Sequence, residues 1–143
     1  MKDQRVTMIT LGVDDLARAK AFYAKLGWVP AEETETVVFY RMDGMMLGLF
    51  GRASLAEDQG RAGAVLGTGA MTLAQNHASS DAVDAAFARA EAAGAAVLKR
   101  PEPVFWGGYS GYFADPDGHV WELAHNPFWP LDAEGRLAPE DTR

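Results

Sequence analysis

The sequence has 143 residues, of which 48% are hydrophobic and 23% are charged, and it contains no cysteine. This composition is typical of one globular domain and excludes cysteine-ligated zinc, iron–sulfur clusters and thiol nucleophiles. Thirteen Lys and Arg against twenty Asp and Glu give a formal net charge of −7, which disfavours a nucleic acid partner. No apolar stretch has the length of a membrane span or a signal peptide. We therefore expect a cytoplasmic protein that binds no nucleic acid and no membrane.

The first half of the chain predicts the order β-α-β-β-β. Residues 6–13 are rich in β-forming side chains, and residues 14–26 carry apolar side chains at helical spacing until Gly27 ends the helix. Asp43-Gly44 is typical of a tight turn between two strands. Further strands are expected at residues 28–31, 37–42 and 45–50.

The same order returns in the second half. A strand at residues 70–77 precedes a helix at 81–93, with Ser80 as the expected N-cap. Asp115-Pro116-Asp117-Gly118 predicts a hairpin turn. The remaining strands are expected at residues 96–99, 104–106, 109–114 and 119–125. A repeat of about 65 residues is too long for a solenoid unit and indicates a duplicated α+β module.

These elements predict a single domain over residues 5–125, with modules at 5–51 and 69–125. Residues 52–68 are rich in Gly and Ala without a clear period, which favours a linker or mobile flap between the modules. Residues 126–143 contain three prolines and predict an irregular C-terminal arm. Open sheet edges and this apolar arm favour a homodimer.

Three segments carry a family resemblance: TLGVDDLARAKAFYAKLGW, DAVDAAFARAEAAGAAV and above all GYFADPDGHVWEL. They resemble the vicinal oxygen chelate superfamily, which includes glyoxalase I, bleomycin-resistance proteins, fosfomycin-resistance transferases and extradiol dioxygenases. The resemblance implies an α+β fold in which two βαβββ modules form curved sheets around an open cup. In this superfamily the cup holds the ligand or metal, and a homodimer often completes it.

The resemblance also implies where a metal would bind. The ligand positions of metal-using members correspond here to Met8, Gly48, Met71 and Glu122, of which only Glu122 is a competent ligand. A thioether and a glycine do not suit a hard or borderline divalent cation. We therefore expect no metal and no other cofactor, with a divalent metal as the disfavoured alternative.

Strand alternation selects candidate lining residues, because residues two apart share a sheet face. If Met8 and Glu122 face the cup, so do the residues that alternate with them: Thr10, Met46, Phe50, Leu73, Gln75, His77, Val120 and Ala124. Such a Met-rich apolar lining with few polar groups is typical of a small-molecule pocket. Glu122 is then a polar anchor or a general base, or a remnant of the fold that is hydrogen-bonded in place.

Aromatic and histidine side chains complete the candidates. Trp106 and Tyr109 lie among three glycines and are expected to stack on a planar ligand. Of the histidines, His77 is the best candidate for the cup, because it alternates with Met71 and Gln75, and a role at the entry to the following helix is an equal alternative. His119 is expected to face solvent beside the turn, and His125 to lie on the helix side of the sheet.

The favoured function is metal-free binding of a small apolar or aromatic molecule in the cup. The expected ligand-binding residues are Met8, Thr10, Met46, Phe50, Met71, Gln75, His77, Trp106, Tyr109 and Glu122. The alternative is a lyase or dioxygenase-type enzyme with catalytic Glu122 and a degenerate metal site, relocated to Glu122 with His77 or Gln75. A third possibility is an interaction protein that uses no pocket, so the sequence leaves open whether the chain is an enzyme.

Overall fold

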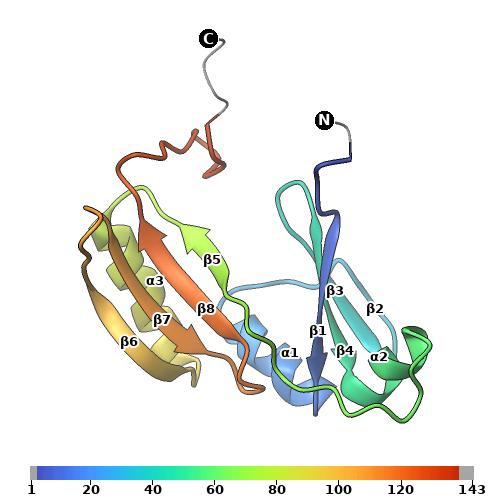
Figure 1. Cartoon of the computed structure of the whole chain (residues 1–143). Coiled ribbons are helices and arrows are strands. Elements are labelled where there is room, and N and C mark those ends of the chain that lie inside the picture. The colour runs from blue at the N-terminus through green and yellow to red at the C-terminus, as the bar shows by residue number, and fades with distance from the viewer. Residues whose placement is uncertain (1–2, 139–143) are drawn as a thin grey trace. The chain divides into compact units, whose positions relative to one another are not determined.

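Each half of the chain forms a four-stranded mixed sheet with its own helices (Figure 1). The computed structural model describes residues 3–138. Unit 1 comprises the chain up to Ala70 together with Pro116–His119, and unit 2 comprises Met71–Asp115 together with the chain from Val120 onward. Both units contain the order βαβββ, so the predicted α+β fold with two modules is confirmed.

Unit 1 has the sheet order β1-β4-β3-β2, in which β1 runs parallel to β4 and the other pairs are antiparallel. Its elements are β1 (Met8–Val13), α1 (Leu16–Lys25), β2 (Glu32–Glu33), β3 (Val37–Arg41), β4 (Met46–Gly51) and α2 (Arg52–Asp58). Helix α1 begins after Asp15, whose side chain accepts a hydrogen bond from the Arg18 amide at 3.1 Å. Its core consists of Leu11, Val13, Phe22, Tyr23, Val38, Tyr40, Leu47 and Leu49.

Unit 2 repeats this arrangement, with the sheet order β5-β8-β7-β6 and β5 parallel to β8. Its elements are β5 (Leu73–Asn76), α3 (Ser80–Ala92), β6 (Ala96–Pro103), β7 (Tyr109–Ala114) and β8 (Val120–His125). Helix α3 packs against β6, β7 and β8 on one face of the sheet (Figure 1). The core on that face consists of Val83, Ala86, Phe87, Ala90, Phe113, Trp121 and Leu123.

The structure corrects several predicted boundaries. The second strand lies at β2 rather than at residues 28–31, where the Trp28 ring instead stacks on Tyr23 with 4.8 Å between centroids. Strand β6 runs on to Pro103, and residues 104–106 are not a strand. The N-cap of α3 is Ser79, whose hydroxyl accepts from the Ala82 amide at 3.1 Å.

The segment expected to be a linker without regular structure begins with helix α2. This helix packs against the end of β1. A Cβ on Gly12 would lie only 3.3 Å from the Arg52 Cγ and 3.4 Å from the Leu55 Cδ2. Its apolar residues Leu55 and Ala56 are partly or fully buried. The helix was missed because seven residues are too few for a clear helical period.

The predicted hairpin turn after β7 is present, and its residues Asp115 and Asp117 are buried. The Asp117 side chain is fully buried, and its Oδ1 accepts hydrogen bonds from the Asp14 amide at 2.8 Å and the Arg18 guanidinium at 3.1 Å. His119 is partly buried with its Nε2 2.7 Å from the Gly12 carbonyl oxygen, so the prediction that it faces solvent is wrong. These contacts place the turn in unit 1.

The buried turn leads to a stability prediction. Asp117→Ala leaves the Asp14 amide without this acceptor, so the free energy of unfolding should fall by about 1–3 kcal/mol. Asp43→Ala is the matched control, because Asp43 precedes the glycine of the equivalent turn but is exposed. Urea denaturation followed by circular dichroism measures both variants. Equal loss in the two variants would contradict the role assigned to Asp117.

Candidate functional site

The parallel register of β5 against β8 decides which side chains lie beside Glu122. Ala74 pairs with Glu122 and Asn76 pairs with Ala124, so these four residues share the face of the sheet that points away from α3. We call it the open face of unit 2. Across β7 it also includes Ser110 and Tyr112, which pair with Ala124 and Glu122.

The same register corrects the expected side of β5. Leu73 pairs with Trp121 and Gln75 with Leu123, both in the core beneath α3. His77 follows Gln75 by two residues and therefore shares that side. The prediction that Leu73, Gln75 and His77 lie on the face of Glu122 is wrong. Met71 precedes β5 and is exposed, so strand alternation does not place it.

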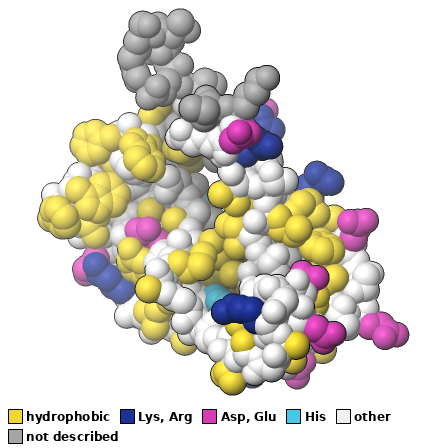
Figure 2. Space-filling model, turned by 45° about the vertical axis from the view of Figure 1, so that its right-hand side comes forward, with side chains coloured by type: hydrophobic (Ala, Val, Ile, Leu, Met, Phe, Trp, Pro, Cys, Tyr) yellow, Lys and Arg dark blue, Asp and Glu magenta, His cyan; other side chains and the backbone are white. Residues whose placement is uncertain are grey.

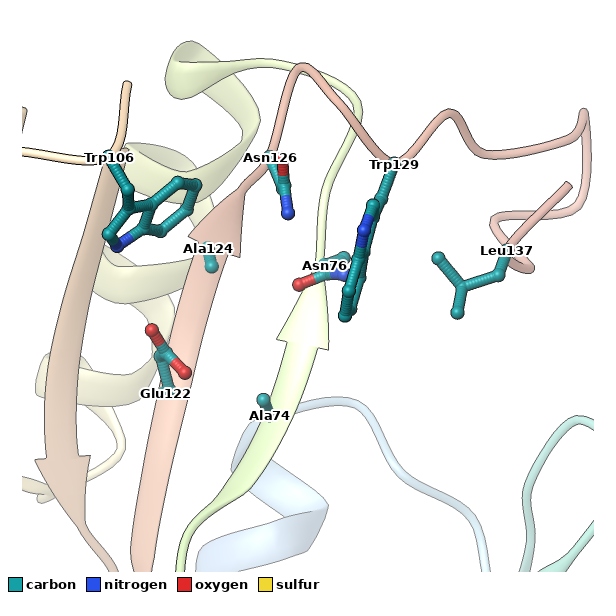
Figure 3. A pocket seen from close by; sticks show the side chains of 8 residues that line it. All are labelled: Ala74, Asn76, Trp106, Glu122, Ala124, Asn126, Trp129 and Leu137. Carbon is teal, nitrogen blue, oxygen red and sulfur yellow. The ribbon is translucent and has the colours of Figure 1, made fainter. Parts of the chain in front are cut away.

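A cavity of about 570 Å³ lies on the open face of unit 2. It is lined by Ala74, Asn76, Trp106, Glu122, Ala124, Asn126, Trp129 and Leu137 (Figure 3). Ala74 and Ala124 project little and form its floor. The indoles of Trp106 and Trp129 lie on opposite sides, and the Glu122 carboxylate lies below Trp106. Two flat aromatic walls over a small-residue floor suit a flat ligand.

Glycines hold the Trp106 wall in position. A Cβ on Gly108 would overlap the Trp106 indole, so the ring can lie against the backbone only because residue 108 is glycine. A Cβ on the neighbouring Gly107 would lie 3.2 Å from the Phe128 ring. The loop that carries Trp106 is therefore packed against the start of the C-terminal arm.

The arm supplies the opposite wall and is more regular than expected. The Asn126 Oδ1 accepts a hydrogen bond from the Phe128 amide at 2.9 Å, and Leu131 and Leu137 form an antiparallel bridge. The Asp132 Oδ1 accepts from the amides of Glu134 and Arg136 at 2.9 and 3.0 Å. This local turn could have been predicted from the Asp and Gly of DAEG. The predicted arm residues 139–143 lie outside the described residues.

Sequence reasoning missed most of the cavity lining. It named Trp106 and Glu122 and placed Ala124 correctly, but it assigned no binding role to Asn76, Asn126, Trp129 or Leu137. It also named Tyr109 as a wall. The Tyr109 hydroxyl instead donates a hydrogen bond to the Asp84 Oδ1 on α3 at 2.6 Å, and this bond raises the pKa of Tyr109. Tyr109 therefore belongs to the helix side.

Glu122 has a neutral partner on the neighbouring strand. Burial raises the pKa of Tyr112, and the Glu122 carboxylate adds to the increase by its charge and by accepting a hydrogen bond. The hydroxyl therefore stays protonated and donates to Glu122 at neutral pH. None of the salt bridges among residues 3–138 involves Glu122. The cavity thus contains a carboxylate whose charge is balanced by no cation of the described residues.

In unit 1 the expected alternation is confirmed. Met8 pairs with Met46 and Gly12 with Phe50, so these residues and Thr10 share the sheet face that does not carry Leu11 and Leu49. A second cavity, of about 430 Å³, is lined by Thr36, Phe50, Ser54, Glu57 and Asp58. A ligand-binding role for this face stays a prediction.

Comparison with known proteins identifies the family. The sequence matches the family described as Glyoxalase/Bleomycin resistance protein/Dioxygenase superfamily over residues 5–123. The chain belongs to this superfamily. It is similar to a glyoxalase-related enzyme from Fulvimarina pelagi, at 38% identity and a TM-score of 0.88 over 95% of this chain and 98% of that one. No curated protein matches.

Two further solved structures resemble this superfamily member. A lactoylglutathione lyase from Agrobacterium tumefaciens has 25% identity and a TM-score of 0.72, with 92% of this chain and 100% of that chain covered. A glyoxalase/bleomycin resistance protein/dioxygenase family enzyme from Burkholderia phytofirmans PsJN has 20% identity and a TM-score of 0.73, with 83% and 96% covered. The second likeness shows the fold alone.

The metal positions of the superfamily do not fit a metal in this chain. A Cβ on Gly48 would lie 3.3 Å from the Phe39 ring, so no ligand-bearing side chain has room there unless Phe39 moves. The register shifts the position equivalent to Met8 from Met71 to Thr72, because Thr10 and Ala74 pair with Gly48 and Glu122. Within the described part of the chain, no group of three or more His, Cys, Asp or Glu could hold a metal ion.

His77 has a structural environment rather than a place in the cavity. Its amide donates to the Ala124 carbonyl at 2.7 Å, and its carbonyl accepts from the His125 Nδ1 at 3.0 Å. Its own Nε2 is buried with no hydrogen-bond partner among the described residues. Burial lowers the pKa of His77, and the charge of Arg89 lowers it further.

This environment predicts a pH-dependent stability. The folded state disfavours protonation of His77, whereas the unfolded chain takes up the proton near pH 6.5. Stability should therefore fall as the pH drops through this value. Urea denaturation gives the free energy of unfolding of the wild type and of His77→Gln, whose side chain stays neutral. On acidification the wild type should lose stability relative to the variant. A difference in free energy of unfolding that does not change with pH would contradict the prediction that His77 is buried in its neutral form.

Proposed function

We propose that this superfamily member binds a small, flat apolar or aromatic molecule in the cavity of unit 2 without a metal ion. The observation that carries the proposal is the pair of indoles, Trp106 and Trp129, on opposite sides of a floor of small residues (Figure 3). Glu122 supplies an acceptor at one end of the cavity. The missing metal donors at residues 8 and 48 support binding without a metal.

The expected affinity follows from the size of these interactions. Stacking on an aromatic side chain contributes about 0.5–1.5 kcal/mol beyond the burial of area. A hydrogen bond to a charged group adds about 1.5–3 kcal/mol. Together with apolar burial they can reach about −8 kcal/mol, which corresponds to a dissociation constant near 1 μM.

An enzymatic function is the second candidate. Two similar solved structures are those of a glyoxalase-related enzyme and a lactoylglutathione lyase. In such a reaction Glu122 would accept a proton while Tyr112 orients its carboxylate. A metal site relocated to Glu122 with Gln75 or His77 has no support, because the β5 register turns those two side chains toward α3.

The proposed binding can be tested with acridine, a flat neutral fluorophore. Trp106→Ala and Trp129→Ala should each weaken acridine binding by about tenfold, since each removes one stacking wall and the area that it buries. Phe105→Ala is the matched control, because Phe105 adjoins Trp106 in sequence, is fully exposed and does not line the cavity. Fluorescence titration gives the dissociation constants.

Dialysis against a chelator is included in the same titration. The affinity of the wild type for acridine should not change after dialysis if no metal takes part. Binding that is lost with the metal would support the enzymatic alternative. Equal binding by all three aromatic variants would show that the cavity is not the binding site.

We also propose a homodimer in the cytoplasm, as the sequence predicts. Exposed apolar side chains of the arm, including Phe128, Trp129 and Leu137, favour contact with a second copy. Figure 2 shows hydrophobic side chains at the surface in the view that it draws. None of the described helices is long and apolar enough to cross a membrane. Sedimentation velocity at micromolar concentration should show a dimer. A monomer there would contradict the proposal.

A further inference from the structure

The charge of the cavity limits the chemistry of its ligand. We propose that the ligand of the unit 2 cavity carries a cationic nitrogen on or next to its flat ring, and that the Glu122 carboxylate pairs with this nitrogen. The inference rests on the proposed function and names the ligand class for the same site.

The first observation is that Glu122 forms no ion pair with any Lys, Arg or His of residues 3–138. Its lining neighbours include no Lys, Arg or His. Its partner Tyr112 donates a neutral hydroxyl. Lys99 pairs with Tyr112 across β6 and β7, but its Nζ lies 3.3 Å from the Glu102 Oε1 and forms an ion pair with that residue. A ligand cation would therefore supply the charge that the cavity lacks.

The second observation is the aromatic walls. Indole faces carry a negative quadrupole and attract a cation that lies against them. The Glu122 carboxylate lies directly below the Trp106 indole in Figure 3, so one ligand can stack on the ring and place its nitrogen near the carboxylate. An anionic ligand would be repelled by the carboxylate and by the negative faces of the indoles, and the cavity lining has no Lys, Arg or His to balance this repulsion.

The remaining polar groups accept such a ligand. Asn76 and Asn126 line the space between the two indoles (Figure 3), and each amide oxygen can accept a hydrogen bond from a ligand N–H. A charge-assisted hydrogen bond is shorter and stronger than a neutral one. Selectivity should therefore come mainly from Glu122, and the amides should add orientation.

Three matched probes test the charge preference. At neutral pH 9-aminoacridine is a cation, acridine is neutral and acridine-9-carboxylate is an anion, and all three share one flat ring system. The wild type should bind 9-aminoacridine about tenfold more tightly than acridine and should bind the carboxylate weakest. Glu122→Gln should bring the first two within about twofold of each other.

Asp81→Asn is the control, because it removes an exposed carboxylate of helix α3, on the other face of the sheet and outside the cavity lining. It should keep the preference for 9-aminoacridine. Circular dichroism checks that Glu122→Gln is folded. Independently of any variant, the preference in the wild type should decrease as salt concentration rises.

The outcomes separate this inference from the proposed function. Equal binding of acridine and 9-aminoacridine that is weakened in Trp106→Ala would overturn the cation preference and leave the binding function standing. A preference that survives in Glu122→Gln would overturn the pairing with Glu122. If neither probe binds, both the proposed function and the inference fail.

Discussion

The parallel pairing of β5 with β8 is the constraint on which the candidate site depends. It places Ala74 beside Glu122 and Asn76 beside Ala124, which gives the cavity a low floor next to a carboxylate. Because side chains alternate along a strand, a shift of one residue would turn Gln75 toward Glu122 and Asn76 into the core. The chemistry of the cavity is therefore set by a backbone register rather than by any single side chain.

Close backbone approach positions the aromatic walls. Trp106 lies against Gly108, and Phe128 lies against Gly107, so the loop before β7 and the arm after β8 are packed at adjacent glycines. Trp129 follows Phe128 and so reaches the opposite side of the cavity (Figure 3). A larger residue at position 108 would displace the Trp106 indole, and one at position 107 would press on the Phe128 ring next to Trp129. Both glycines therefore help to set the shape of the cavity.

The superfamily shares one fold among many chemistries, so function has to be derived from the site. In this member Glu122 is present, whereas Met8 and Gly48 offer no donor that suits a divalent metal ion. The glutamate accepts a hydrogen bond from Tyr112 and lies below Trp106 in the view of Figure 3. The position that the family resemblance assigns to a metal ligand therefore lies, in this chain, in a cavity with aromatic walls, and we propose that it pairs with a cationic ligand.

The sequence by itself determined the two βαβββ modules, helices α1 and α3 and the turns that follow glycine signals, because helical spacing and turn glycines are local signals. The sequence also predicted correctly which residues of β1 and β4 share a sheet face, because apolar core residues such as Leu11 and Val13 alternate with other side chains. In β5 the run Leu73-Ala74-Gln75-Asn76 has no clear alternation, so only pairing with β8 decided its register. The tertiary structure likewise decided the burial of Asp117, which depends on a contact with Asp14, a residue distant in sequence. It also decided the position of Trp129 beside the cavity, because the arm that carries Trp129 has no periodic pattern from which a position could be predicted.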